Sequence, residues 1–227
     1  EFCRGVFEEI RARGDEAVAE YTLKYDKVEL ADCRVSAEEF QAASAKVPAK
    51  LMSAMELAAR NIRKFHSSQQ MPTNPLEVQQ GVTCWRASRA IQSVGLYVPG
   101  GTAVLPSSVL MLGIPAVLAG CSRVALTVPP LKDGSVSPAV LAAARIAGVR
   151  QVFKVGGAQA IAALSLGTET IPRVDKILGP GNRIVQMAKL VATLRGTAID
   201  MVAGPSEVLV IADGTADPRV VASDLIS

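Results

Sequence analysis

Apolar positions between residues 93 and 206 recur with two different spacings. Short runs of apolar, mostly β-branched residues are followed by turns, and most of these turns lead into segments whose apolar residues recur at helical spacing. This alternation is typical of parallel strands joined by crossover helices, so it predicts an α/β protein built on a parallel sheet. The predicted strands are residues 94–98, 124–128, 152–155, 174–178 and 198–201.

Helices are expected between and after these strands. One begins at Pro106, and Pro115 should kink it or split it in two, because proline has no backbone N–H and clashes with the preceding turn. Asn182 has the side chain of a helix N-cap. The remaining expected elements are helices at residues 137–147, 157–166 and 182–194, a strand at 208–211 and a helix from residue 217.

Residues 1–92 follow a different pattern, with helices first and short strands after them. Ser36 followed by Glu39 has the spacing of a capping box, in which each residue's side chain bonds the other's backbone N–H. A polar stretch at residues 67–75 precedes residues 76–91, which predict two or three antiparallel strands with a turn at Gly81 and Trp85 on one face. The expected helices are residues 3–26 interrupted at Gly14, a segment capped by Ser36, and residues 48–66.

Composition excludes several classes of protein. The 227 residues are 49% hydrophobic and 20% charged, which is typical of a soluble globular protein. The net charge of +3 comes from scattered basic residues, and aromatic residues make up 4%, so nucleic-acid binding is not expected. The longest apolar run, residues 109–119, is too short to span a membrane and contains Gly113 and Pro115.

The cysteines indicate a cytoplasmic location. Nothing at the N-terminus has the pattern of a signal peptide, although the start at Glu1 rather than at a methionine suggests that a short leading segment is missing. No CxxC pair occurs, and the surrounding segments suggest buried, reduced thiols. The four cysteines are Cys3, Cys33, Cys84 and Cys121.

Glycine-rich turns follow four of the predicted strands. The carboxyl ends of parallel strands meet at one edge of a sheet, and ligands of open α/β folds bind there. We therefore expect any ligand site of this chain at that edge. The turns read VPGG at residues 98–101, VGGAQ at 155–159, GPGN at 179–182 and AGPSE at 203–207.

Three uncharged polar residues, Tyr97, Gln159 and Asn182, lie in or beside these turns. Their side chains could hydrogen-bond a ribose, an amide or a phosphate, and glycine at a helix start lets backbone N–H groups approach a phosphate. However, no turn has the GxGxxG spacing, and no acid follows in the ribose-binding position. Two interpretations stay open: a nucleotide site, or sharp turns in which Asn182 is only a cap and Gln159 only a first-turn residue.

No catalytic or metal-ligating residue is expected within the chain. Ser206 and Glu207 resemble a nucleophile and a carboxylate, but the single histidine, His66, ends an amphipathic helix early in the chain, so a Ser-His-Asp site is not expected. Zinc sites draw on His and Cys clusters at set spacing, and we expect His66 to be structural.

Several long motifs closely resemble histidinol dehydrogenase. They occur in the family's order, and the similarity extends over nearly the whole chain. The motifs are NIRKFH at residues 61–66, GLYVPGG at 95–101, GGAQAIAAL at 156–164, DKILGPGN at 175–182, IDM at 199–201 and AGPSEVLVIAD at 203–213.

The resemblance implies an enzyme of histidine biosynthesis. Members of that family are oxidoreductases that convert L-histidinol to L-histidine in two NAD-dependent steps, with a zinc ion holding the substrate. The family residues that contact the nicotinamide cofactor fall on Tyr97, Gln159 and Asn182, and one that touches the substrate falls on Ser206.

The resemblance also implies the architecture. It predicts an incomplete Rossmann-like parallel sheet of the aldehyde-dehydrogenase-like kind, plus part of a second α/β domain with N-terminal helices, in an intertwined homodimer. On this basis residues 1–92 belong to the first domain, residues 93–206 form the NAD-side domain, and residues 207–227 return to the first domain.

The family's zinc ligands are expected outside this chain. In the family, the helix that ends here at Ser227 continues into the sequence QAEHG, which provides two zinc ligands, and the other ligands lie further on. The chain therefore resembles an N-terminal fragment that is inactive alone. Two alternatives stay open: a related zinc- and NAD-dependent dehydrogenase of another amino or hydroxy alcohol, and a non-catalytic dimerising or binding domain.

Overall fold

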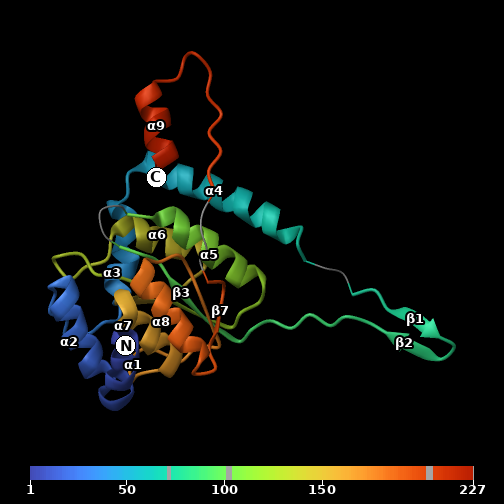
Figure 1. Cartoon of the computed structure of the whole chain (residues 1–227), viewed down its shortest axis with the longest axis horizontal. Helices are drawn as coiled ribbons and strands as arrows, with labels where there is room; N and C mark the ends of the chain where they lie inside the picture. Colours follow the sequence, from blue (N-terminus) through green and yellow to red (C-terminus); the bar gives the residue numbers. More distant parts are fainter. Residues whose placement is uncertain (71–72, 101–103, 203–206, 227) are drawn as a thin grey trace.

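The computed structural model describes residues 1–70, 73–100, 104–202 and 207–226, and its centre is a five-stranded parallel sheet (Figure 1). The strands are β3 (Ser93–Tyr97), β4 (Arg123–Val128), β5 (Gln151–Lys154), β6 (Lys176–Leu178) and β7 (Ala198–Ile199). Their order in the sheet is β5-β4-β3-β6-β7, so β3 pairs with β4 on one side and with β6 on the other. Every strand predicted between residues 93 and 206 is confirmed.

Helices cover both faces of the sheet. They are α1 (Phe2–Arg13), α2 (Asp15–Asp26), α4 (Ala49–Ser67), α5 (Pro106–Leu118), α6 (Pro138–Ala147), α7 (Gly157–Leu166) and α8 (Arg183–Thr193). Successive side chains of a strand point to opposite faces. Leu96 of β3 therefore joins the core with α5 and α6, while its neighbour Tyr97 joins the core with α7 and α8. Outside these layers, α4 packs on α5 and α1 packs on α7.

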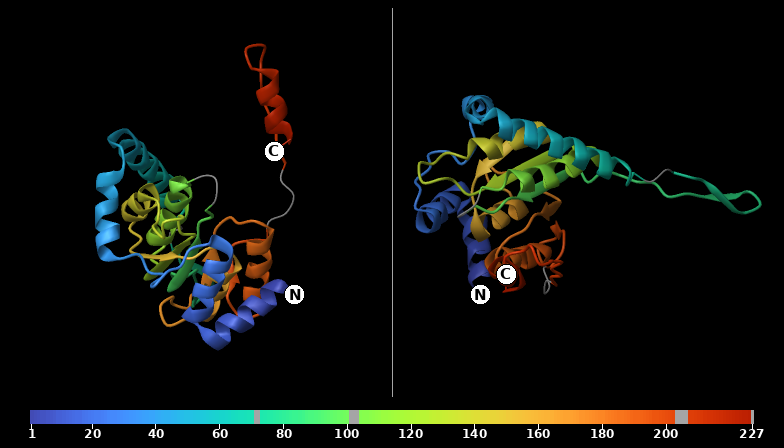
Figure 2. Two further views of the ribbon diagram at one scale, coloured as in Figure 1. Left: turned by 90° about the vertical axis from the view of Figure 1, so that its left-hand side faces the viewer. Right: turned by 90° about the horizontal axis from the view of Figure 1, so that it is seen from above.

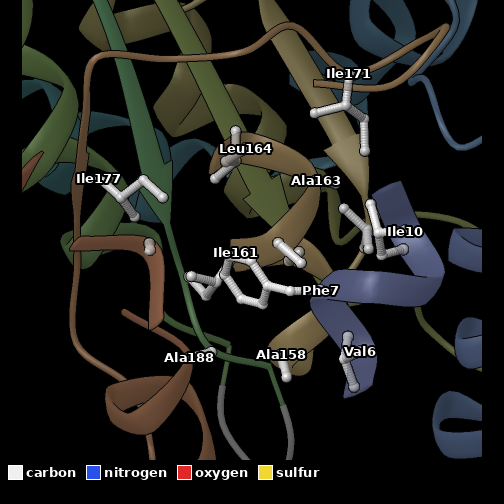
Figure 3. Packing of buried hydrophobic residues seen from close by; sticks show 14 of the residues in the cluster. Val6, Phe7, Ile10, Ala158, Ile161, Ala163, Leu164, Ile171, Ile177 and Ala188 are labelled. Atoms are coloured by element: carbon white, nitrogen blue, oxygen red, sulfur yellow. The ribbon is translucent and has the colours of Figure 1, made fainter. Parts of the chain in front are cut away.

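The first helix contributes its apolar side to the core with α7 and α8. Val6, Phe7 and Ile10 lie on one side of α1 and are each 1% exposed, and Figure 3 shows Phe7 directed toward Ile161 of α7. Gly14 separates α1 from α2, as predicted, and has a φ of 54°. Residues with side chains rarely adopt this angle, so glycine allows the sharp change of direction.

Ser36 caps α3 (Ala37–Ala42), which continues into the 3-10 turn η1 (Ala43–Lys46), but the capping box is only half formed. The hydroxyl of Ser36 accepts a hydrogen bond from the backbone N–H of Glu39 at 3.1 Å. The carboxylate of Glu39 instead accepts from the backbone N–H of Val136 at 3.0 Å and pairs with Lys154 at 2.7 Å. Lys154 of β5 holds the carboxylate of Glu39 against the sheet, so the predicted bond from the backbone N–H of Ser36 to Glu39 does not form, and this part of the prediction is wrong.

A hairpin projects from the body of the molecule. It consists of β1 (Leu76–Gln79) and β2 (Val82–Cys84), which pair antiparallel and are fully exposed (Figures 1 and 2). Gly81 turns between them with a φ of 79°. Trp85 follows β2 rather than lying in a strand, and the described residues 85–91 form no third strand.

Two further expectations are wrong, and a third is wrong in part. Helix α5 is one continuous helix through Pro115, so it is not split in two there. Residues 208–211 form no strand, because no neighbouring strand pairs with them in the described chain. Cys84 is exposed rather than buried, because it lies in the hairpin. A helix does follow residue 217, α9 (Pro218–Ile226).

Among the described residues, no helix combines the length and the apolar character that crossing a membrane would need.

We predict that Phe7→Ala destabilises the protein strongly. The substitution removes a fully buried ring from between α1 and α7, so the free energy of unfolding should fall by about 3–5 kcal/mol in chemical denaturation. Phe65→Ala is the control, because Phe65 is 63% exposed on α4 and its loss should change this free energy by about 0.5 kcal/mol at most. Equal losses in the two variants would contradict the packing of α1 described here.

Candidate functional site

The carboxyl ends of the strands meet at one edge of the sheet, and Tyr97 lies at the centre of that edge. It is the last residue of β3 and is 4% exposed. Its phenolic oxygen accepts a hydrogen bond of 3.2 Å from the backbone N–H of Gly157, the first residue of α7. Burial raises the pKa of Tyr97, so the phenol keeps its proton and can donate it to a hydrogen-bond acceptor.

Gln159 reaches the same edge in the first turn of α7. It is 2% exposed. A Cβ atom on Gly157, whose φ is 62°, would lie 2.7 Å from the Oε1 atom of Gln159, so only glycine leaves room for this carboxamide. The hydrogen bond between Gly157 and Tyr97 therefore brings Tyr97 to the same turn as Gln159.

Asn182 approaches from the other side of β3, at the start of α8. Its Oδ1 atom accepts a hydrogen bond from the backbone N–H of Val185 at 3.0 Å, so the predicted helix cap is confirmed. The turn before it lies against β3, because a Cβ atom on Gly179 would come 2.1 Å from the carbonyl oxygen of Tyr97. Glycine is therefore the only residue type that permits this contact at position 179, and the φ of 135° there also favours glycine.

An ion pair between a buried lysine and a partly exposed aspartate holds this turn in place. Lys189 of α8 is 1% exposed, donates from Nζ to the carbonyl oxygen of Gly179 at 2.8 Å, and pairs with Asp200. Asp200 in turn accepts from the backbone N–H groups of Gly179 and Met201, each at 2.8 Å. Burial acts to raise the pKa of Asp200, but the bonds from Lys189, Gly179 and Met201 outweigh it and lower that pKa below its usual value.

A cavity of about 350 Å³ lies at the ends of β3 and β4; Pro99, two residues beyond Tyr97, is in its lining, whereas Tyr97, Gln159 and Asn182 are not. Its walls include Pro99, which belongs to the predicted turn at residues 98–101, and also Pro129 and Asp26, neither of which was predicted as a site residue. Asp26 is the last residue of α2. An acid at that place is unusual, because the C-terminus of a helix carries partial negative charge, and this was the one sequence signal for it.

The glycines at this edge pack closely against other residues. A Cβ atom on Gly156 would lie 2.5 Å from a side-chain carbon of Pro129, and one on Gly100 would lie 3.0 Å from the same residue. These glycines therefore let the turns after β3, β4 and β5 approach each other, which agrees with the interpretation of the motifs as sharp turns.

Two other residues were considered from the sequence. Ser206 lies outside the described residues. His66, near the end of α4, makes a hydrogen bond of 2.6 Å through Nδ1 to Gln69, as suits a structural role. Within the described ranges, no three His, Cys, Asp or Glu side chains lie together as metal ligands would.

The model of the family described as histidinol dehydrogenase matches residues 1–227. The chain belongs to the histidinol dehydrogenase family. Curated proteins named histidinol dehydrogenase from Bacteroides thetaiotaomicron and Escherichia coli K12 are each 52% identical to it, over 99% and 98% of this chain. A crystal structure of histidinol dehydrogenase from Elizabethkingia anophelis superposes with a TM-score of 0.91 at 51% identity, over 98% of this chain.

The chain spans about half the length of these histidinol dehydrogenases, because the matches cover 52% and 51% of the two curated proteins and 51% of the crystallised one. The sheet described here is consistent with the incomplete Rossmann-like α/β fold expected from the resemblance. Family membership confirms the sequence-based identification, whereas the roles of Tyr97, Gln159, Asn182 and Ser206 stay predictions.

We predict that Lys189→Met destabilises the chain by about 1–3 kcal/mol, because it removes the cation and charged donor that Asp200 and the carbonyl oxygen of Gly179 share. Chemical denaturation measures the loss. Arg219→Met is the control, since it breaks a surface pair with Asp217 in which the arginine is 91% exposed, and it should leave the unfolding free energy nearly unchanged. A variant at 189 as stable as the control would contradict a structural role for the pair.

Asp200 should also make stability depend on pH. Its pKa is lowered in the folded protein, so the unfolded chain takes up the proton first as pH falls. The unfolding free energy should therefore fall below about pH 4, and this loss should be smaller in Asp200→Asn, which has no proton to take up. Denaturation curves from about pH 5 to about pH 2 measure the difference. Identical pH dependence in the two proteins would show that Asp200 does not contribute.

Proposed function

We propose that the protein to which this chain belongs oxidises L-histidinol to L-histidine in two NAD-dependent steps, as in the histidine biosynthesis that the resemblance implies. The observation that carries the proposal is the family match over residues 1–227, together with relatives at 52% identity that are named histidinol dehydrogenase. Family membership supports an oxidoreductase as the full-length protein. Its cofactors, substrate and assembly are parts of the proposal.

The described residues fit a nicotinamide dinucleotide. The edge of the sheet offers a protonated phenol from Tyr97, carboxamides from Gln159 and Asn182, and the N-terminal ends of α7 and α8, whose partial positive charge suits phosphates. When bound, NAD accepts a hydride from the substrate. In this proposal Tyr97, Gln159 and Asn182 hold and orient the cofactor, and Ser206 contacts the substrate.

The described residues do not fit a zinc site, because they bring together no set of three ligating side chains. The zinc implied by the resemblance would need ligands from outside residues 1–227, so in this proposal the chain contributes the cofactor-binding residues and the substrate contact of Ser206.

We also infer a cytoplasmic homodimer. The four cysteines are free. Large apolar side chains are exposed on α4 and on the hairpin, where a second subunit could cover them; they include Leu51 at 38%, Leu57 at 51%, Val78 at 57% and Val82 at 47%.

The activity is tested with a chimera that extends the chain beyond Ser227 with the corresponding sequence of the Escherichia coli relative. With L-histidinol, NAD and zinc, the chimera should form two NADH for each L-histidinol, while residues 1–227 alone should form none at steady state. The matched control is the chimera with other amino alcohols. Turnover of those alcohols but not of L-histidinol would favour a related dehydrogenase, and NADH from residues 1–227 alone would contradict the proposed division of the site.

A further inference from the structure

Asp26 is held in an unfavourable place by the fold. It is the last residue of α2, where the partial negative charge of the helix end disfavours an acid, and Lys27 after it leaves the helix with a left-handed φ of 60°. Its Oδ2 atom is buried and has no hydrogen-bond partner within the described residues. Burial also raises the pKa of Asp26, as expected for a carboxylate without compensation.

The neighbours of Asp26 form a site of suitable size and chemistry for a nucleoside. Asp26 and Tyr25 both line the cavity of about 350 Å³ at the ends of β3 and β4. The rings of Pro99 and Pro129 add apolar walls, and Gly100 brings backbone to the same wall. A planar base suits the apolar surfaces of Pro99 and Pro129, while a carboxylate is an acceptor for sugar hydroxyls.

The cavity lies next to the predicted cofactor residues. Pro99 is two residues beyond Tyr97, and Pro129 contacts the turn through Gly156 that leads to Gln159. A dinucleotide held by Tyr97 and Gln159 at one end can therefore place its other nucleoside in the cavity.

We propose that Asp26 binds the ribose hydroxyls of the adenosine half of NAD and thereby selects NAD over NADP. This inference rests on the proposed function, since it assumes that a nicotinamide dinucleotide binds at this edge. Dinucleotide-binding proteins with a GxGxxG turn place an acid after the following strand for this purpose. This chain has no such turn, and α2 supplies the acid from a distant part of the sequence instead.

Charge explains the selection. A 2′-phosphate in place of the 2′-hydroxyl would bring like charges together and would leave the carboxylate without a donor. Lys132 also lines the cavity and would attract a phosphate, but it is exposed, so water and salt screen its charge more than that of half-buried Asp26.

The experiment compares NAD and NADP binding by isothermal titration to the full chain and to Asp26→Asn. The variant should bind NAD about tenfold more weakly, and its preference for NAD over NADP should shrink by a similar factor. Its melting temperature without nucleotide should rise by about 2–4 °C, because an amide removes the buried, unpaired charge. If Asp26 binds the ligand, Asp26→Asn should be more stable and should bind NAD more weakly. If Asp26 were structural, the variant should instead be less stable.

Asp32→Asn is the matched control. It makes the same change of charge nearby, but Asp32 does not line the cavity, and its bond from the backbone N–H of Arg34 at 2.7 Å can be kept by an amide oxygen. Nucleotide binding and the NAD preference should stay unchanged in this variant.

A second ligand keeps the inference testable even if Asp26→Asn does not fold. NAD with a 2′-deoxyadenosine should bind the unsubstituted chain about tenfold more weakly than NAD, because it lacks the 2′-hydroxyl that donates a hydrogen bond to Asp26 in this proposal. Equal binding of the two would overturn the role of Asp26, as would an Asp26→Asn variant with unchanged affinity and preference, while NAD binding itself would still support the cofactor assignment. Binding of neither NAD nor NADP to the unsubstituted chain would overturn both.

Discussion

The pairing of β3 with β4 on one side and β6 on the other is the constraint on which the rest of the structure depends. It brings the ends of these strands together and leaves Tyr97 between the turns that begin α7 and α8. The approach is close: a Cβ atom on Gly95 of β3 would lie 2.9 Å from Leu164 of α7. Because β3 has no side chain there, α7 lies directly on the strand, and its N-terminus meets the hydroxyl of Tyr97.

Asp200 and Asp26 are two partly buried acids at this edge that differ in whether hydrogen bonds compensate their charge. Asp200 accepts hydrogen bonds from Lys189 and from two backbone N–H groups, and these bonds lower its pKa despite burial. Asp26 has a buried oxygen without a partner, and its pKa is raised. The first acid stabilises the turn that leads to Asn182. The second destabilises the free chain, and a cost of this kind is expected where a ligand supplies the missing partner.

Much of the fold and the place of the site could be predicted from the sequence. Apolar runs gave the five strands, and the side chain of Asn182 gave its role as a cap, because these features depend on neighbouring residues. Residues 208–211 have the same apolar pattern but form no strand, since a strand also needs a partner. Leu209 and Ile211 are 84% and 91% exposed. Glu39 likewise has the spacing of a capping box, yet Lys154 draws its carboxylate away.

The sequence by itself determined the alternation of strands and helices, the family, and the edge of the sheet where Tyr97, Gln159 and Asn182 lie, because spacing and motifs are local properties of the chain. Only the tertiary structure decided that Asp26 borders the same edge and that Lys189 is buried against Asp200. Both facts depend on segments that are distant in sequence and meet through packing. Burial and hydrogen bonding of a charge follow from that packing and cannot be derived from the residues beside it in the chain.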